Sequence, residues 1–321
     1  MLMPALRRPR NAYLPALLAA LLLVVGWPCG LSPARAQSAF PFRDYNRASP
    51  RLPTPDEVKA VGVLLVDGHT GEVLYSRNPD EHLLPASTTK LMTALIVYEK
   101  IGMRGSVTIT DDDTRVEPSS IPLIPGETVS VYNLFHALLI ESANDAAKAL
   151  GRAVAGSNEA FIDMMNQRAM AMGCFNTHFE NSNGLPAPAG THYTSCADLM
   201  RIFRAVIAHP ELREICRTKE FRLTTAAKTQ ILRNHNRLLG YYPGMDAAKT
   251  GWTVASRHTY AASVIRGRHE LLLTLLDSPN KWSDAQILFN WGLALEDSRP
   301  GASAAAAATA PAGRATDTST P

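Results

Sequence analysis

Strand-like segments lie near both ends of this chain, and a helical block separates them. Apolar runs at 61–66 and 72–75, joined by the turn sequence Asp67-Gly68-His69-Thr70-Gly71, have the pattern of a β-hairpin. From Ser87 onward the apolar residues instead recur at helical spacing. Strands at both ends of a domain, with a helical block inserted between them, predict a mixed α/β (α+β) fold.

The remaining segments follow the same division. Helices are expected at 131–140, 143–155, 158–172, about 195–207 and 282–295. Strands are expected at 107–109, 220–223, 229–232, 247–250, 259–265 and 271–276. The sequence contains no internal repeat.

Residues 1–36 have the pattern of a secretory signal peptide. A basic n-region at 7–10 precedes an apolar run at 16–27, and small residues at 34–36 suit cleavage before Gln37. The apolar run is too short to span a bilayer of about 30 Å comfortably, and a retained anchor is the alternative. We therefore expect an exported protein, in the periplasm or at the extracellular face of the cell envelope, without a strong membrane anchor after cleavage.

Three further segments follow the leader. Residues 37–57 are rich in Pro, Arg and Ser and are expected to form an exposed lead-in. Residues 58–297 are expected to form the catalytic domain. The Ala/Pro/Thr-rich tail, 298–321, is expected to be disordered.

The chain has 32 Lys+Arg and 29 Asp+Glu. Four arginines and no acids lie in the leader, so 28 basic and 29 acidic residues remain. The alkaline pI therefore does not indicate nucleic-acid binding.

The cysteines do not form a disulfide or metal framework in the sequence. Cys174, Cys196 and Cys216 remain after cleavage, an odd number at irregular spacing. We expect three small buried hydrophobic residues, with a single disulfide as the alternative in an oxidising compartment. Neither zinc-ribbon spacing nor an H-E-x-x-H motif is present, so no metal and no cofactor are expected.

The segment Pro85-Ala86-Ser87-Thr88-Thr89-Lys90 carries the first chemical signal. Ser87 stands where a helix should begin, and Lys90 follows one turn later on the same face. A serine hydroxyl is a weak nucleophile until a base takes its proton, and a lysine can be that base if burial or another cation lowers its pKa. The S-x-x-K pattern alone is common, and most examples are an N-cap serine beside a solvated lysine.

Two later tripeptides change the interpretation of that segment. Ser142-Ala143-Asn144 lies at a helix junction 55 residues after Ser87, and Lys249-Thr250-Gly251 ends a strand 107 residues further on. S-x-x-K, S-x-N and K-T-G in this order are the signature of penicillin-binding proteins and serine β-lactamases.

The first two motifs supply the residues that move protons. Ser87 is the expected acyl-carrying nucleophile, and Lys90 is its base. Ser142 can relay a proton between Lys90 and the leaving amine. The amide of Asn144 can hold the lysine side chain and a substrate carbonyl.

The third motif supplies substrate contacts. Lys249 and Thr250 offer a cation and a hydroxyl for a substrate carboxylate. Gly251 lets substrate lie against the strand without a Cβ in the way. The backbone N–H groups of Ser87 and Trp252 are the expected oxyanion hole.

Over roughly residues 55–295 the chain resembles low-molecular-weight penicillin-binding proteins of the D-alanyl-D-alanine carboxypeptidase family. The resemblance is carried by 85–94 (PASTTKLMTA), 141–147 (ESANDAA), 172–179 (MGCFNTHF), 183–185 (NGL) and 234–239 (NHNRLL). It implies an antiparallel sheet flanked by helices, with an inserted, mainly helical subdomain. It also implies a serine-type hydrolase that trims peptidoglycan stem peptides, in cell wall biogenesis and cell shape, and that β-lactam antibiotics inhibit.

Two features depart from that family's pattern. Ala143 stands where many of these carboxypeptidases have Gly. A polar tail follows position 297, where many relatives add a β-rich domain and an amphipathic membrane-binding helix. We therefore expect no strong membrane attachment through this end.

Three alternative functions remain open at this point. The same motifs would serve a DD-endopeptidase acting on cross-linked stems, a serine β-lactamase, or a non-catalytic envelope-binding protein that keeps the fold. Fast penicillin hydrolysis needs a second base, and the only acid in the corresponding stretch is Glu180, which lacks the E-x-x-L-N context of class A β-lactamases. We therefore expect penicillin to acylate Ser87 and to leave slowly.

Overall fold

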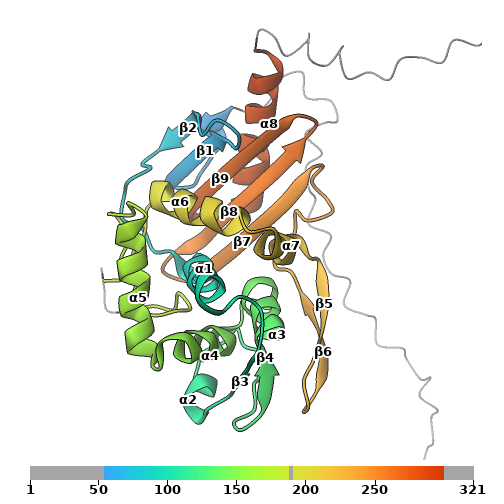
Figure 1. Ribbon diagram of the computed structural model, residues 1–321. Helices are drawn as coiled ribbons and strands as arrows, with labels where there is room; N and C mark the ends of the chain where they lie inside the picture. Colours follow the sequence, from blue (N-terminus) through green and yellow to red (C-terminus); the bar gives the residue numbers. More distant parts are fainter. Residues whose placement is uncertain (1–53, 188–190, 300–321) are drawn as a thin grey trace, which may run out of the picture. The chain divides into compact units, whose positions relative to one another are not determined.

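A computed structural model of the chain describes residues 54–187 and 191–299, all within one compact unit (Figure 1). The expected signal peptide, most of the lead-in and nearly all of the tail lie outside these described residues, so the predictions for them stay predictions. Pro55–Glu57 forms a short 3₁₀ turn that enters the domain. No helix between residues 54 and 299, outside 188–190, is long and apolar enough to cross a membrane.

A five-stranded antiparallel sheet joins the two ends of the described chain. Its order is β2-β1-β9-β8-β7. The strands are β1 (Gly62–Asp67), β2 (Val73–Arg77), β7 (Met245–Thr253), β8 (Arg257–Arg266) and β9 (His269–Ser278). The register pairs Val63 with Leu275, and β7 forms a free edge of the sheet. The strands predicted at both ends of the domain therefore share one sheet.

Helices cover both faces of this sheet (Figure 1). In α8 (Lys281–Asp297), a Cβ added at Gly292 would lie 2.9 Å from Leu65, so this helix packs closely on one face. On the other face, a Cβ at Gly62 would lie 3.0 Å from the Cys196 Sγ of α6 (Cys196–Ile207). Successive strand residues point to opposite faces, so burial of both faces explains why the runs are continuously apolar rather than alternating.

A helical region is inserted between β2 and β7, as expected. Its helices are α1 (Lys90–Ile101), α2 (Asp111–Thr114), α3 (Val131–His136), α4 (Asn144–Ala155), α5 (Asn158–Ala171), α6 and α7 (Pro210–Arg217). Serine caps begin several of them: Ser130 accepts from Asn133 N, and Ser195 accepts from Asp198 N. The buried side chains of α1, including Leu91 and Leu95, join this region to the sheet in one hydrophobic core.

Four strands lie outside the main sheet. They form two separate two-stranded antiparallel sheets, β3 (Ser106–Thr108) with β4 (Thr128–Ser130), and β5 (Glu220–Thr224) with β6 (Thr229–Arg233). The strands expected at 220–223 and 229–232 thus exist but pair only with each other.

The three described cysteines are free and buried, as expected from their spacing. Burial raises the pKa of Cys174, Cys196 and Cys216 to about 12. The alternative of a disulfide among them is therefore wrong for this structure.

Candidate active site

Ser87 lies in a 3₁₀ turn, Ala86–Thr89, immediately before α1. The α-helix was expected to begin at Ser87, but it begins at Lys90, because the chain turns more tightly where Thr88 Oγ1 donates to Pro85 O at 2.6 Å. In a 3₁₀ turn the side chains at i and i+3 eclipse each other. This geometry places Lys90 directly beside Ser87, with Lys90 Nζ 3.0 Å from Ser87 Oγ.

Lys90 is completely buried, and three oxygen atoms lie at hydrogen-bond distance from its Nζ. In the neutral amine, two N–H groups donate to Asn144 Oδ1 at 2.7 Å and to the Asn183 carbonyl oxygen at 2.6 Å, which leaves the lone pair for the hydroxyl of Ser87. Burial holds the pKa of Lys90 well below its usual range, and the positive charge of Lys249 lowers it further. A lysine in this state can take a proton from the adjacent hydroxyl.

Two glycines enclose the backbone at Ser87. Gly184 has a φ of +85°, and a Cβ there would overlap the Ala86 carbonyl group and lie 3.0 Å from Ser87 N. A Cβ at Gly251 would lie 2.8 Å from the same nitrogen. Gly251 was expected to make room for substrate, and that role stays a prediction; the lack of a Cβ also leaves room for the backbone at Ser87. Ala86 has a φ of +46°, a conformation that persists only where the surroundings impose it.

Ser142 ends an unusual helical turn. α3 continues as a π-helical turn, Ala137–Glu141, and Ser142 then adopts a left-handed φ of +63°. Such π turns occur mostly as single inserted turns at functional sites. Ser142 Oγ accepts a 2.9 Å hydrogen bond from Lys249 Nζ, which joins the second and third motifs.

Lys249 lies on β7 and is also almost completely buried, with 2 % of its surface exposed. Its Nζ also donates to the Thr250 carbonyl oxygen at 2.8 Å. Burial lowers the pKa of Lys249 to about 7, and the positive charge of Lys281 contributes. Lys249 therefore changes charge near neutral pH.

Asn144, the first residue of α4, holds two parts of the site together. Its Oδ1 accepts from Lys90, while its Nδ2 donates to the Glu117 carbonyl oxygen at 2.8 Å. An amide nitrogen carries two hydrogens, and the predicted contact of the second one with a substrate carbonyl stays a prediction. The expected contact with the lysine side chain is present.

A cleft of about 470 Å³ opens in front of these groups. Among the residues that line it are Ser87, Ser142, Thr250, Gly251 and Trp252. The structure thus brings the predicted residues together, with Trp252 exposed over 58 % of its surface at the mouth.

The sequence did not point to the basic groups on one side of this cleft, Arg237, His258 and Lys281. Lys281 Nζ lies 3.0 Å from His258 Nδ1, and burial together with the positive charges of Lys281 and Arg237 lowers the pKa of His258 to about 4. Burial and Arg237 also lower the pKa of Lys281 to about 8. A concentration of cationic groups beside Thr250 is suited to an anionic substrate group.

The side chain of Glu180 is partly exposed. Its carboxylate lies 3.4 Å from His178 Nδ1, and 37 % of its side chain is accessible. Its backbone N–H donates to His192 Nδ1 at 3.1 Å. The carboxylate pairs with a surface histidine, as expected for a solvated group rather than a second base.

Comparison with known proteins gives a consistent result. The family model described as D-alanyl-D-alanine carboxypeptidase matches residues 49–280. D-alanyl-D-alanine carboxypeptidase DacB2 of Mycobacterium tuberculosis is 31 % identical over 250 residues, 76 % of this chain and 85 % of that protein. DacF of Bacillus subtilis is 33 % identical, and the match covers 78 % of this chain but 65 % of that relative.

Solved structures show the same similarity. The crystal structure of a D-alanyl-D-alanine carboxypeptidase from Mycobacterium tuberculosis H37Rv aligns with a TM-score of 0.71 and 30 % identity, covering 77 % of this chain and 95 % of that one. A variant of the Streptomyces K15 DD-transpeptidase aligns with a TM-score of 0.70 and 30 % identity, covering 74 % and 98 %.

Proposed function

The chain belongs to the D-alanyl-D-alanine carboxypeptidase family, and from that premise we propose that it is a serine-type carboxypeptidase of peptidoglycan stem peptides. It removes the terminal D-alanine through an acyl-enzyme on Ser87. The observation that carries the proposal is a buried lysine with a lowered pKa, Lys90, at hydrogen-bond distance from a serine hydroxyl.

The proposed reaction begins with attack of Ser87 Oγ on the carbonyl carbon between the two D-alanines. Neutral Lys90 takes the hydroxyl proton, and the N–H groups of Ser87 and Trp252 stabilise the oxyanion. Ser142, hydrogen-bonded to Lys249, relays this proton from Lys90 to the leaving amine, so Lys90 is neutral again before the acyl-enzyme is hydrolysed. Water then attacks the acyl carbon and returns a proton to Ser87, which releases the shortened stem.

The cationic side of the cleft supports recognition of a free C-terminal carboxylate. Arg237 and Lys281 line the cleft together with Thr250, whose hydroxyl is a further donor, and the buried Lys249 Nζ lies 2.8 Å from the Thr250 carbonyl oxygen. A β-lactam carries a carboxylate next to its reactive carbonyl and is proposed to acylate Ser87 in the same way. We also propose that the enzyme acts outside the cytoplasm, on the basis of the leader pattern at 1–36, which lies outside the described residues.

The test uses the protein without its leader, a stem pentapeptide and cross-linked muropeptides, with products identified by mass. Release of D-alanine is expected from the pentapeptide, and Ser87→Ala should reduce it by about 10³-fold or more. Ser106→Ala, an exposed serine of β3, is the matched control and should be unchanged. Lys90→Arg keeps the charge but cannot give up a proton at working pH, so it should resemble Ser87→Ala.

The same experiment distinguishes the alternatives. Cleavage of cross-linked stems without D-alanine release would favour an endopeptidase. Penicillin labelling that persists at another residue in Ser87→Ala would refute the nucleophile. Rapid penicillin turnover that is lost in Glu180→Gln would indicate a β-lactamase.

A further inference from the structure

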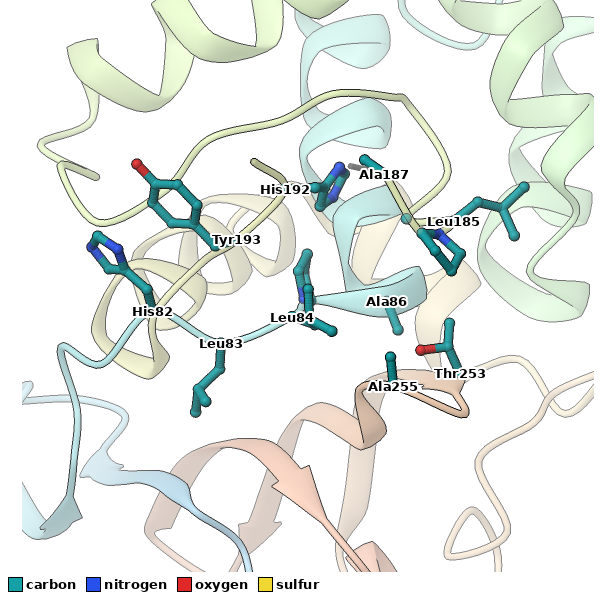
Figure 2. A pocket seen from close by; sticks show the side chains of 13 residues that line it. His82, Leu83, Leu84, Ala86, Leu185, Ala187, His192, Tyr193, Thr253 and Ala255 are labelled. Atoms are coloured by element: carbon teal, nitrogen blue, oxygen red, sulfur yellow. The ribbon is translucent and has the colours of Figure 1, made fainter. Parts of the chain in front are cut away.

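A second cavity, of about 500 Å³, begins one residue from Ser87 (Figure 2). Its walls come from the segment 82–86, the loop 184–187 and the end of β7 with the turn that follows it. Figure 2 shows Ala86 lying between Leu185 and the side chains of Thr253 and Ala255. The cavity is therefore continuous with the segment that positions Ser87 rather than a remote surface hollow.

Of the described residues that line this cavity, most are apolar and none is an acid, a lysine or an arginine. Among the described residues that line it, the titratable side chains are those of His82, His192 and Tyr193. Burial lowers the pKa of His192 to about 4, and its Nε2 lies 3.0 Å from Thr89 Oγ1, so this ring is neutral. His82 stacks on Tyr193 with ring centroids 4.2 Å apart. The character of this cavity is thus opposite to that of the cationic side of the cleft.

The edge strand β7 connects the two pockets. Thr250 lines the cationic cleft, and Thr253 lines the apolar cavity. Three residues of strand span about 10 Å, the length of three residues of an extended peptide. Free edges of sheets accept such peptides as an added strand. A stem with its terminal carboxylate near Thr250 and its scissile bond at Ser87 therefore brings its third residue from the C-terminus to the apolar cavity.

We propose that this cavity is a specificity pocket for the side chain of that third residue, and that it selects aliphatic length without providing a partner for a terminal charge. This inference rests on the proposed function. Each methylene buried in an apolar site is expected to raise kcat/KM about fourfold. A terminal ammonium gains nothing there, because burial of a charge without a partner is unfavourable.

The first test uses acetylated tripeptides X-D-Ala-D-Ala, with alanine, norvaline, norleucine or lysine as X. We expect kcat/KM to rise from alanine to norleucine, as the side chain lengthens. It should fall when lysine replaces norleucine, although this replacement removes no methylene. Equal rates along the alkyl series, or lysine cleaved faster than norleucine, would overturn the proposal. Failure to release D-alanine from every peptide would instead contradict the proposed function.

A charge placed at the cavity supplies the second test. Ala255 lies in the turn after β7, is exposed and lines the cavity, so Ala255→Glu adds a carboxylate there without disturbing the core. The kcat/KM ratio of lysine to norleucine peptide should rise about three- to tenfold. Val254→Glu is the matched control, because it adds the same charge one residue away. Val254 is 85 % exposed and does not line the cavity. Equal effects in the two variants, or none in either, would contradict the pocket.

Discussion

Replacement of Gly184 by alanine should slow the acylation of Ser87 about 100-fold. The φ of +85° is unfavourable for any residue with a Cβ, at about 1–2 kcal/mol. The larger effect is steric, because the new Cβ would overlap the carbonyl group of Ala86 and lie 3.0 Å from Ser87 N. Both neighbours are backbone, so relief requires the segment that carries Ser87 to move by about 1 Å, and such a displacement costs about 10²-fold in rate.

The assay is the second-order rate constant for acylation by a fluorescent penicillin, measured together with thermal unfolding. Gly156→Ala is the matched control: its φ is +86°, but among the described residues no heavy atom lies within 4 Å of the new Cβ. That variant should lose about 1–2 kcal/mol of stability and acylate at the wild-type rate. Acylation of Gly184→Ala within about threefold of wild type would refute the idea that this contact positions Ser87.

Two further predictions concern charge. The pKa of Lys249 is about 7 and that of Lys281 about 8, so their positive charges are lost as the pH rises through these values. The kcat/KM ratio of a free-acid stem to its C-terminal amide should therefore fall across this range. A ratio that does not change with pH would contradict the carboxylate site. Arg152 forms hydrogen bonds from Nε and Nη2 to the fully buried carboxylate of Asp113, so Arg152→Ala should cost about 3–5 kcal/mol in urea unfolding. Lys148→Ala removes a pair with an exposed carboxylate and should cost about 0–1 kcal/mol; equal losses would contradict this assignment.

The sequence predicted the elements of the site that are encoded locally. Ser87, Ser142 and Lys249 each lie in a short, recognisable pattern. The structure brings Ser87 and Ser142 to one cleft and places Lys249 Nζ 2.9 Å from Ser142 Oγ. Periodicity likewise predicted the strands at 220–223 and 229–232. It could not predict their partners, because an alternating run indicates a strand but not the strand beside it.

The parts that were not predicted depend on contacts between distant segments. Asn183 contributes a backbone carbonyl to Lys90, and a backbone group leaves no mark on residue type. Lys281, the first residue of α8, and Arg237, in the segment before β7, line the same cleft although 44 positions separate them in the sequence. The close approach of Gly251 to Ser87 N was also not predicted, because this contact is visible only in three dimensions.

The sheet order also determines when the enzyme can become active during folding. Val63 pairs with Leu275, 212 positions later, and β9 lies between β1 and β8. Contacts so distant in sequence form slowly, whereas helices such as α4 and α5 need only local contacts. A chain that stops before β9 leaves β1 and β8 without their common neighbour, so β7 has no stable sheet from which to meet Ser87. Penicillin binding thus reports the last stage of assembly, after most of the helical structure has formed.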